Sequence, residues 1–185
     1  NQWWGTILYR VADGTEGANF TFNIPNSRAD MAIGSIIAFS GVDVTGGFNA
    51  SGAANSGPFD VAPNPLSIQT NDATNITATG ITTVTNNAAV IMLAMASNDR
   101  TYSGWSTAND GNLTEVYENL TDQSDDASIG ASWIIKGTAG STGSGSATLS
   151  GDARRASILL ALRPITCAKS AGPASSSPTS CINTA

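Results

Sequence analysis

The feature that most constrains the fold is an approximate internal repeat with a constant spacing along the chain. The segment Val11–Gly17 resembles Ile134–Gly140, and Ile36–Phe39 resembles Leu159–Leu162. Both matches share one offset, since 137 − 14 = 123 and 159 − 36 = 123. Two separated blocks with a single offset are harder to obtain by chance than either block alone. The sequence therefore predicts a fold built from two related halves.

One predicted strand of the second half has no counterpart in the first half. In the second half, an apolar segment, Ala89–Ala96, and the pair Gly104 and Trp105 precede the matched blocks. Shifted back by the same offset, that strand would start at 89 − 123 = −34, outside the sequence. We therefore expect either a piece of a longer protein or a first half that takes a strand from elsewhere by β-strand addition, near Thr6–Val11 and Ile33–Phe39.

Hydrophobic patterning predicts about ten short antiparallel strands separated by turns. Phe20–Ile24 alternates strictly, so its apolar side chains share one face. Ala89–Ala96 is almost continuously apolar, which is typical of a strand covered on both faces. The other predicted strands are Thr6–Val11, Ile33–Ser40, Asn75–Val84, Leu113–Tyr117, Ser128–Lys136, Ser146–Leu149 and Ser157–Arg163.

Glycine, asparagine and aspartate mark the breaks between these strands. Turns are predicted at Asp13-Gly14, Asn26-Ser27, Asn86-Asn87, Asp110-Gly111 and Gly151-Asp152. The predicted fold is all-β: a jelly-roll-like antiparallel β-sandwich of two related halves over residues 1–166. Residues 167–185 form a Ser/Pro-rich linker, or the start of a next repeat, and Thr45–Pro65 is expected to be a long irregular connection.

The composition excludes several classes of partner. Charged residues make up 12% of the chain, the net charge is −6, and histidine is absent. Nucleic-acid phosphates and anionic lipids require Lys/Arg clusters, so neither partner is expected. No apolar segment approaches the roughly 20 residues that a membrane-spanning helix requires. The Ser, Thr, Gly, Asn and Ala content is typical of secreted β-rich proteins, which predicts an extracellular, cell-surface location.

Few residues support catalysis, and we predict no enzymatic activity. Without histidine, a Ser-His-Asp or Cys-His arrangement cannot form. The only lysines, Lys136 and Lys169, are not in a Ser-x-x-Lys setting. Asp122, Asp125 and Asp126 are expected to form a solvated loop. They are also weak candidates for a Ca²⁺ site, although their spacing matches no EF-hand. No other metal or cofactor is expected.

The two cysteines, Cys167 and Cys181, lie close together in the C-terminal tail. They can form a disulfide with each other, worth on the order of 3 kcal/mol, or each can pair with a cysteine in a following domain. Either arrangement fits an oxidising, extracellular environment. Asn-x-Ser/Thr motifs occur at Asn19, Asn49, Asn75, Asn112 and Asn119, as expected in a chain rich in Asn and Thr.

The four tryptophans divide into core and surface candidates. Trp133, inside a predicted strand, is expected in the core, and Trp105 is expected to anchor a loop to the core. Trp3 and Trp4 are adjacent, so in a strand they would face opposite sides. One of them is a candidate for stacking on a sugar ring or contacting another surface.

Several segments resemble a known kind of module. Tyr9–Gly17, Ala38–Asp43 and Ala161–Pro164 resemble a β-sandwich module of bacterial surface and phage-associated proteins. The tail Ala171–Ala185, ending in Cys-Ile-Asn-Thr-Ala, resembles the start of a repeat in very large Bacteroidota cell-surface adhesins similar to gliding-motility adhesins exported by type IX secretion. The resemblance implies a secreted, multidomain, filamentous adhesin without catalytic residues. In that family an apolar strand and a Gly-Trp pair come before the Tyr-Arg-Val segment, and both are missing here.

The function predicted from the sequence is therefore structural and adhesive: one module of an extracellular filament or giant cell-surface adhesin. Its expected partners are neighbouring modules or subunits of the same protein, with a surface or glycan ligand as a further possibility. Two alternatives stay open. A carbohydrate-binding module would use Trp3 or Trp4, and a phage tail or capsid decoration protein would assemble as a trimer in solution.

Overall fold

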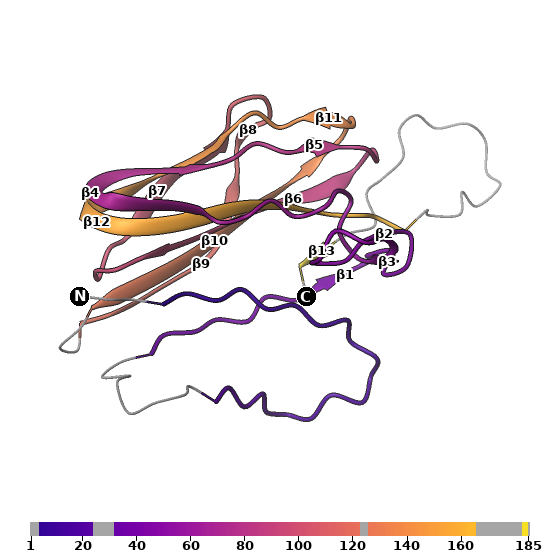
Figure 1. Ribbon diagram of the computed structural model, residues 1–185, viewed down its shortest axis with the longest axis horizontal. Helices are drawn as coiled ribbons and strands as arrows, with labels where there is room; N and C mark the ends of the chain where they lie inside the picture. The colour runs from indigo at the N-terminus through magenta and orange to yellow at the C-terminus, as the bar shows by residue number, and fades with distance from the viewer. Residues whose placement is uncertain (1–3, 24–31, 123–125, 166–182, 185) are drawn as a thin grey trace.

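The computed structural model describes residues 4–23, 32–122, 126–165 and 183–184 and shows an all-β protein with no helix in those ranges (Figure 1). All strand pairs are antiparallel. The strands are β1 (Phe39–Ser40), β2 (Gly47–Phe48), β3 (Ala54–Gly57), β4 (Ser67–Ala78), β5 (Thr82–Thr83), β6 (Ala88–Ala96), β7 (Tyr102–Thr107), β8 (Gly111–Asn112), β9 (Thr114–Thr121), β10 (Ala127–Lys136), β11 (Gly140–Ser141), β12 (Gly145–Leu162) and β13 (Asn183–Thr184).

The main sheet has the strand order β8-β7-β12-β6-β10-β9, with β4 also paired to β12. The long strand β12 joins two parts of this sheet. Its first residues, Gly145–Leu149, pair with β7, whereas Arg155–Leu162 pair with β6, and β4 pairs with both parts. One strand thus has different neighbours at its two ends, and the sheet curls into half a barrel (Figure 1).

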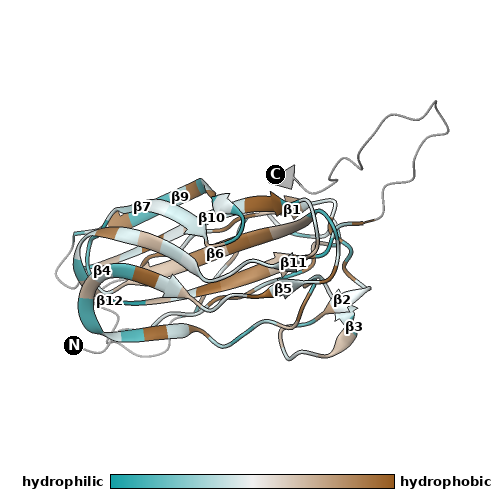
Figure 2. Ribbon diagram, turned by 90° about the horizontal axis from the view of Figure 1, so that it is seen from above, coloured by the Kyte–Doolittle hydropathy of each residue, from teal (hydrophilic) through white to brown (hydrophobic). Residues whose placement is uncertain are grey.

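The apolar strand β6 lies at the centre and is covered on both faces, as its sequence predicts (Figure 2). Residues on its two faces belong to two different clusters, because successive side chains in a strand point to opposite sides. We call the cluster within the curl the inner core; it contains Val90, Met92, Trp105 and Leu159. The cluster on the opposite face, the outer core, contains Phe59, Ile91, Leu160 and Leu162.

Predictions for the second half of the chain agree in part with the observed strands. Asn75–Val84, predicted as one strand, is divided between the end of β4 and β5, and β7 is not among the predicted strands. Ser146–Leu149 and Ser157–Arg163, predicted as two strands, belong to the single strand β12. The predicted turn at Gly151-Asp152 is therefore wrong. These residues lie where the register between β12 and β4 shifts, so they form an irregularity within the strand. A bulge accommodates extra residues and bends a strand without ending it.

Predictions for the first half are largely wrong in the described residues. Thr6–Val11 and Phe20–Asn23 form no ladder, and of Ile33–Ser40 only Phe39–Ser40 is paired, with Asn183–Thr184. Their composition suits a strand, but a strand also requires a neighbouring backbone, and these segments have none. The segment Thr45–Pro65, expected to be irregular, contains the small β2–β3 hairpin. Ile24 and most of the predicted linker lie outside the described residues.

A buried arginine holds the irregular part of β4 in place. Arg155 is 4% exposed, and its guanidinium donates to the backbone carbonyls of Asn71 at 2.7 Å, Asn75 at 2.5 Å and Ala153 at 3.2 Å. Between Gln69 and Ala73, β4 loses regular pairing with β12. Carbonyls that leave a ladder need another donor, and the guanidinium supplies it.

We therefore expect Arg155→Met to lower the free energy of unfolding by about 3 kcal/mol, since it leaves buried carbonyls without donors. Urea denaturation of the variant and the wild type measures this difference. The adjacent Arg154 is the matched control. It is half exposed and lies 4.0 Å from Asp72, so Arg154→Met should cost less than about 1 kcal/mol. Equal losses in the two variants would contradict this role for Arg155.

Candidate functional site

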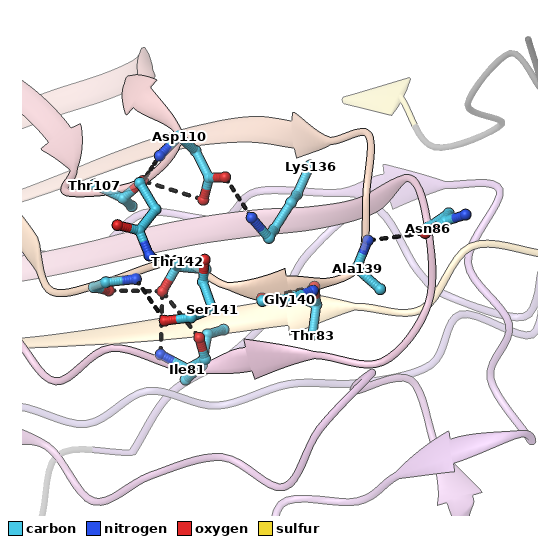
Figure 3. A network of polar contacts seen from close by, with 12 residues as sticks. Ile81, Thr83, Asn86, Thr107, Asp110, Lys136, Ala139, Gly140, Ser141 and Thr142 are labelled. Carbon is cyan, nitrogen blue, oxygen red and sulfur yellow. Dashed lines mark hydrogen bonds and ion pairs between the residues drawn. The ribbon is translucent and has the colours of Figure 1, made fainter.

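The residues weighed for catalysis are held in structural contacts. The ammonium group of Lys136 lies 2.5 Å from Asp110 Oδ1, and the two side chains are only 9% and 12% exposed (Figure 3). The Thr107 hydroxyl donates to the other carboxylate oxygen of Asp110 at 3.2 Å and accepts a hydrogen bond from the Asp110 backbone N–H. The Lys136 amine is thus an ion-pair partner of Asp110. Lys169 lies outside the described residues.

The remaining contacts around this pair connect loops at one end of the sheet. Thr142 is fully buried; its hydroxyl accepts from Ile81 N–H and lies 3.1 Å from the Ile81 carbonyl (Figure 3). The side chain of Asn86 accepts from Ala139 N–H at 2.8 Å. Residues from four separate loops are joined in this way, so the network stabilises the fold.

Asp60 is a buried carboxylate that the sequence does not single out. It is 0% exposed, and its Oδ2 accepts from Val84 N–H at 2.7 Å and Thr85 N–H at 3.2 Å. Its Oδ1 has no hydrogen-bond partner among the described residues. The backbone N–H of Asp60 donates to Ala161, so this residue links the end of β12 to the loop after β5. No pattern of spacing reveals this role, because its partners are distant in sequence.

The described residues contain no group of three or more His, Cys, Asp or Glu side chains placed to hold a metal ion. Of the Ca²⁺ candidates, Asp122 is exposed and Asp126 is half-buried, while Asp125 lies outside the described residues. Calcium binding at this loop therefore stays a prediction. Cys167 and Cys181 also lie outside the described residues.

The tryptophans occupy three different environments. Trp105 is 4% exposed and stacks on Tyr102 with ring centroids 5.3 Å apart, while its Nε1 donates to Glu115 at 2.9 Å. It anchors strand β7, not a loop, in the inner core. Burial of Tyr102 raises the pKa of its hydroxyl well above the usual value, so this group is neutral and donates to the Ser128 carbonyl. Trp133 is half-buried in the outer core, Trp4 is 91% exposed, and Trp3 lies outside the described residues.

Two unpaired segments cross the outer face of the sheet. We call residues 4–11 the first arm and residues 32–38 the second arm. The first arm lies against β6 at Gly5, where an added Cβ would stand 1.9 Å from Met95 Sδ, and Tyr9 packs edge-on against Phe59 at 5.0 Å. Ile7 joins the outer core between these two contacts. Both arms are drawn beneath the sheet in Figure 1.

The second arm has an alternating pattern of burial. Ile33, Ser35 and Ile37 are half-buried, while Gly34 and Ile36 between them are exposed. At its start Ser35 accepts a hydrogen bond from the Asn119 side chain of β9. Directly after the arm, Phe39 packs edge-on against Trp133 of β10 at 5.6 Å, and it belongs to β1. This alternation is that of a strand lying on a sheet, although the arm has no ladder of its own.

A loop after β1 fixes the end of the second arm to β12. Asp43 N–H donates to the Arg163 carbonyl at 2.8 Å, and the Asp43 carboxylate lies 3.4 Å from the Arg163 guanidinium. The backbone N–H groups of Gly46 and Thr45 lower the pKa of Asp43, so the carboxylate is charged at neutral pH. A Cβ at position 46 would lie 2.3 Å from Asp43 Oδ2, so a larger residue there would displace this carboxylate.

Residues 4–38 also hold most of the large exposed apolar side chains of the described chain. On the two arms and the segment between them these are Trp4, Leu8, Tyr9, Val11, Phe20, Phe22 and Ile36. Soluble proteins rarely gather this many exposed apolar side chains unless they contact something. The outer face, with its two unpaired arms, is therefore the candidate functional site.

Comparison of the chain with protein-family models, with curated proteins and with solved structures gives no match. In the described residues, no helix capable of spanning a membrane is present. The family resemblance of the sequence thus stays a prediction, and the functional argument depends on the geometry of the outer face.

The buried ion pair gives a direct test of the structural role of Lys136. Removing one member of a buried pair leaves an uncompensated charge, so Lys136→Met should lower the free energy of unfolding by about 3 kcal/mol. Replacing both partners, in Lys136→Met with Asp110→Asn, should recover part of this loss, because the unpaired carboxylate is then gone. Additive losses in a urea-denaturation double-mutant cycle would contradict the pairing.

Proposed function

We propose that this chain is a structural and adhesive module of an extracellular filament or of a very large cell-surface adhesin. Its complete form is a two-sheet, jelly-roll-like sandwich of two related halves, and neighbouring modules are joined by β-strand addition. The observation that carries the proposal is the outer face, where two extended, unpaired arms lie on an otherwise regular sheet. Such a face has both a free backbone and exposed apolar side chains to offer a partner.

Two further features support a mechanical and adhesive role. The sheet contains long antiparallel ladders, with nine residue pairs between β6 and β10 and eight between β6 and β12. Such ladders resist extension because many hydrogen bonds must break together. The low charge content, 12%, and the absence of histidine fit a module that binds through surface contact without catalysis. The composition is also the basis for proposing an extracellular location.

Adhesion by the arms can be measured with protein-coated beads. Beads carrying this chain should be retained under flow on apolar and polymer-coated surfaces. Replacing Leu8, Phe20 and Phe22 by serine should remove most of this retention, since they are 70%, 48% and 60% exposed on the first arm and the segment that follows it. The control replaces Val84 by serine, since this side chain is 62% exposed on the loop after β5. Equal retention by both variants would contradict an adhesive outer face.

A carbohydrate-binding module is the second candidate, and the exposure of Trp4 favours it. An indole that is 91% exposed can stack on a sugar ring. If this is its role, Trp4→Ala should abolish glycan-array binding while circular dichroism and thermal stability stay unchanged. Trp4→Phe, which keeps an aromatic face, should retain part of the binding. An array without any bound glycan would reject this alternative.

A further inference from the structure

The internal repeat and the structure together identify a missing neighbour for both arms. The offset of 123 residues relates β10 (127–136) to residues 4–13, which contain the first arm. It also relates residues 155–162 of β12 to 32–39, which contain the second arm. In the second half, β6 lies between β10 and β12 and pairs antiparallel with both. In the first half, no described segment lies in the corresponding place.

The contacts of the arms show that they run in the same direction. Gly5 of the first arm lies on Met95, near the end of β6, and Tyr9 lies on Phe59. Phe59 pairs with Leu162, which in turn pairs with Ala89 near the start of β6. The first arm therefore runs antiparallel to β6. In the second arm, Ser35 is bonded to Asn119, which pairs with Ile129 of β10. Phe39, directly after the arm, contacts Trp133, which lies further along β10. Both arms therefore follow the direction of β10, as β12 does in the second half. A strand placed between them would be antiparallel to both.

The space between the arms matches the width of one strand near their starts. Gly5 lies on Met95, and Ser35 is bonded to Asn119. Met95, Ile129 and Asn119 are successive partners across β6, β10 and β9. Gly5 therefore lies over β6 and Ser35 over β9, two strands away. Because adjacent strands are about 4.8 Å apart, these two strands are separated by about 10 Å. This separation leaves room for one strand at normal spacing from each arm, and we call this space the slot.

The larger apolar side chains beneath the slot are incompletely covered. On the outer face of β10, Ile129, Trp133 and Ile135 are half-buried, whereas Ala131 between Ile129 and Trp133 is 0% exposed. On its inner face, Ser128 and Ser132 are 0% exposed. Apolar side chains are thus partly open to solvent on one face, whereas serines are fully buried on the other. A covering strand over the slot would remove this mismatch.

An antiparallel strand already pairs with the continuation of the second arm. Phe39 and Ser40 of β1 pair with Thr184 and Asn183 of β13. The backbone at this edge is therefore shaped to accept an antiparallel partner. The ladder covers two residues, Phe39 and Ser40, and does not extend back into the second arm.

We propose that the slot receives one antiparallel, apolar strand of the same type as β6, donated by a neighbouring module of the assembly. The donated strand would bond to the first arm along one edge and to the second arm along the other, and its apolar side chains would cover Ile129 and Trp133. In the described chain, every long apolar strand is already paired on both edges or fills the core, which is why the donor belongs to another module. This inference rests on the proposed function and specifies how its modules are joined.

The test uses a peptide with the sequence of Ala88–Ala96 as a probe, carrying two lysines at each end for solubility. Added to the intact chain, it should bind with one-to-one stoichiometry in a fluorescence titration. Hydrogen exchange of amides in residues 5–11 and 32–38 should slow by about tenfold or more, because they enter a ladder. A peptide with proline at its central position should not bind, since proline removes a ladder donor.

A variant under the slot adds a second readout. Ile129→Asp should weaken peptide binding by about tenfold or more, whereas Val84→Asp, at an exposed position on the loop after β5, should leave it unchanged. Binding that is unaffected by Ile129→Asp, or unchanged exchange in the arms, would overturn the slot. Slow exchange of both arms in the peptide-free monomer would show that the chain fills the slot itself. Bead retention is measured independently, so loss of adhesion with intact peptide binding would reject the proposed function alone.

Discussion

The rest of the structure depends on the backbone pairing of β12. Along one edge it pairs with β4, and along the other it pairs first with β7 and then with β6. The sheet curls around this strand, and the curl encloses the inner core. The irregularity near Gly151 accompanies the bend, and Arg155 supplies hydrogen bonds where β4 can no longer follow β12. An irregular region is thus stabilised by one buried side chain.

The two faces of β6 show how the same strand serves two different environments. Its inner face is completed by side chains from β4, β7 and β12, and the residues there are almost fully buried. Its outer face is covered by arms that contribute side chains but no ladder. The arms are therefore held on the outer core by packing of side chains, whereas the strands around the inner core are joined by both packing and backbone hydrogen bonds. This difference makes the outer face the part of the protein that can gain most from a partner, since both backbone groups and apolar surface remain available there.

The polar contacts at the end of the sheet join loops and strands within the protein, whereas the outer face is open to a partner. Lys136, Asp110 and Thr107 form a compact, buried group whose members all have partners. Asp60 is similarly enclosed. In a chain with so few charged residues, burying several of them in defined contacts specifies how loops dock at the ends of the strands. The ion pair and hydrogen bonds of these groups therefore stabilise the fold.

The sequence by itself determined the all-β class, the central apolar strand and most strand positions of the second half. Alternation and β-branched composition report those features locally, as at Ala89–Ala96. Only the tertiary structure decided that Thr6–Val11 and Ile33–Ala38 are unpaired, because a strand depends on a neighbour that its own residues do not encode. Tertiary structure likewise decided that Gly151-Asp152 continues a strand, and that Lys136 meets Asp110, 26 residues away. Pairings over such distances depend on how the sheet curls, and no local pattern records them.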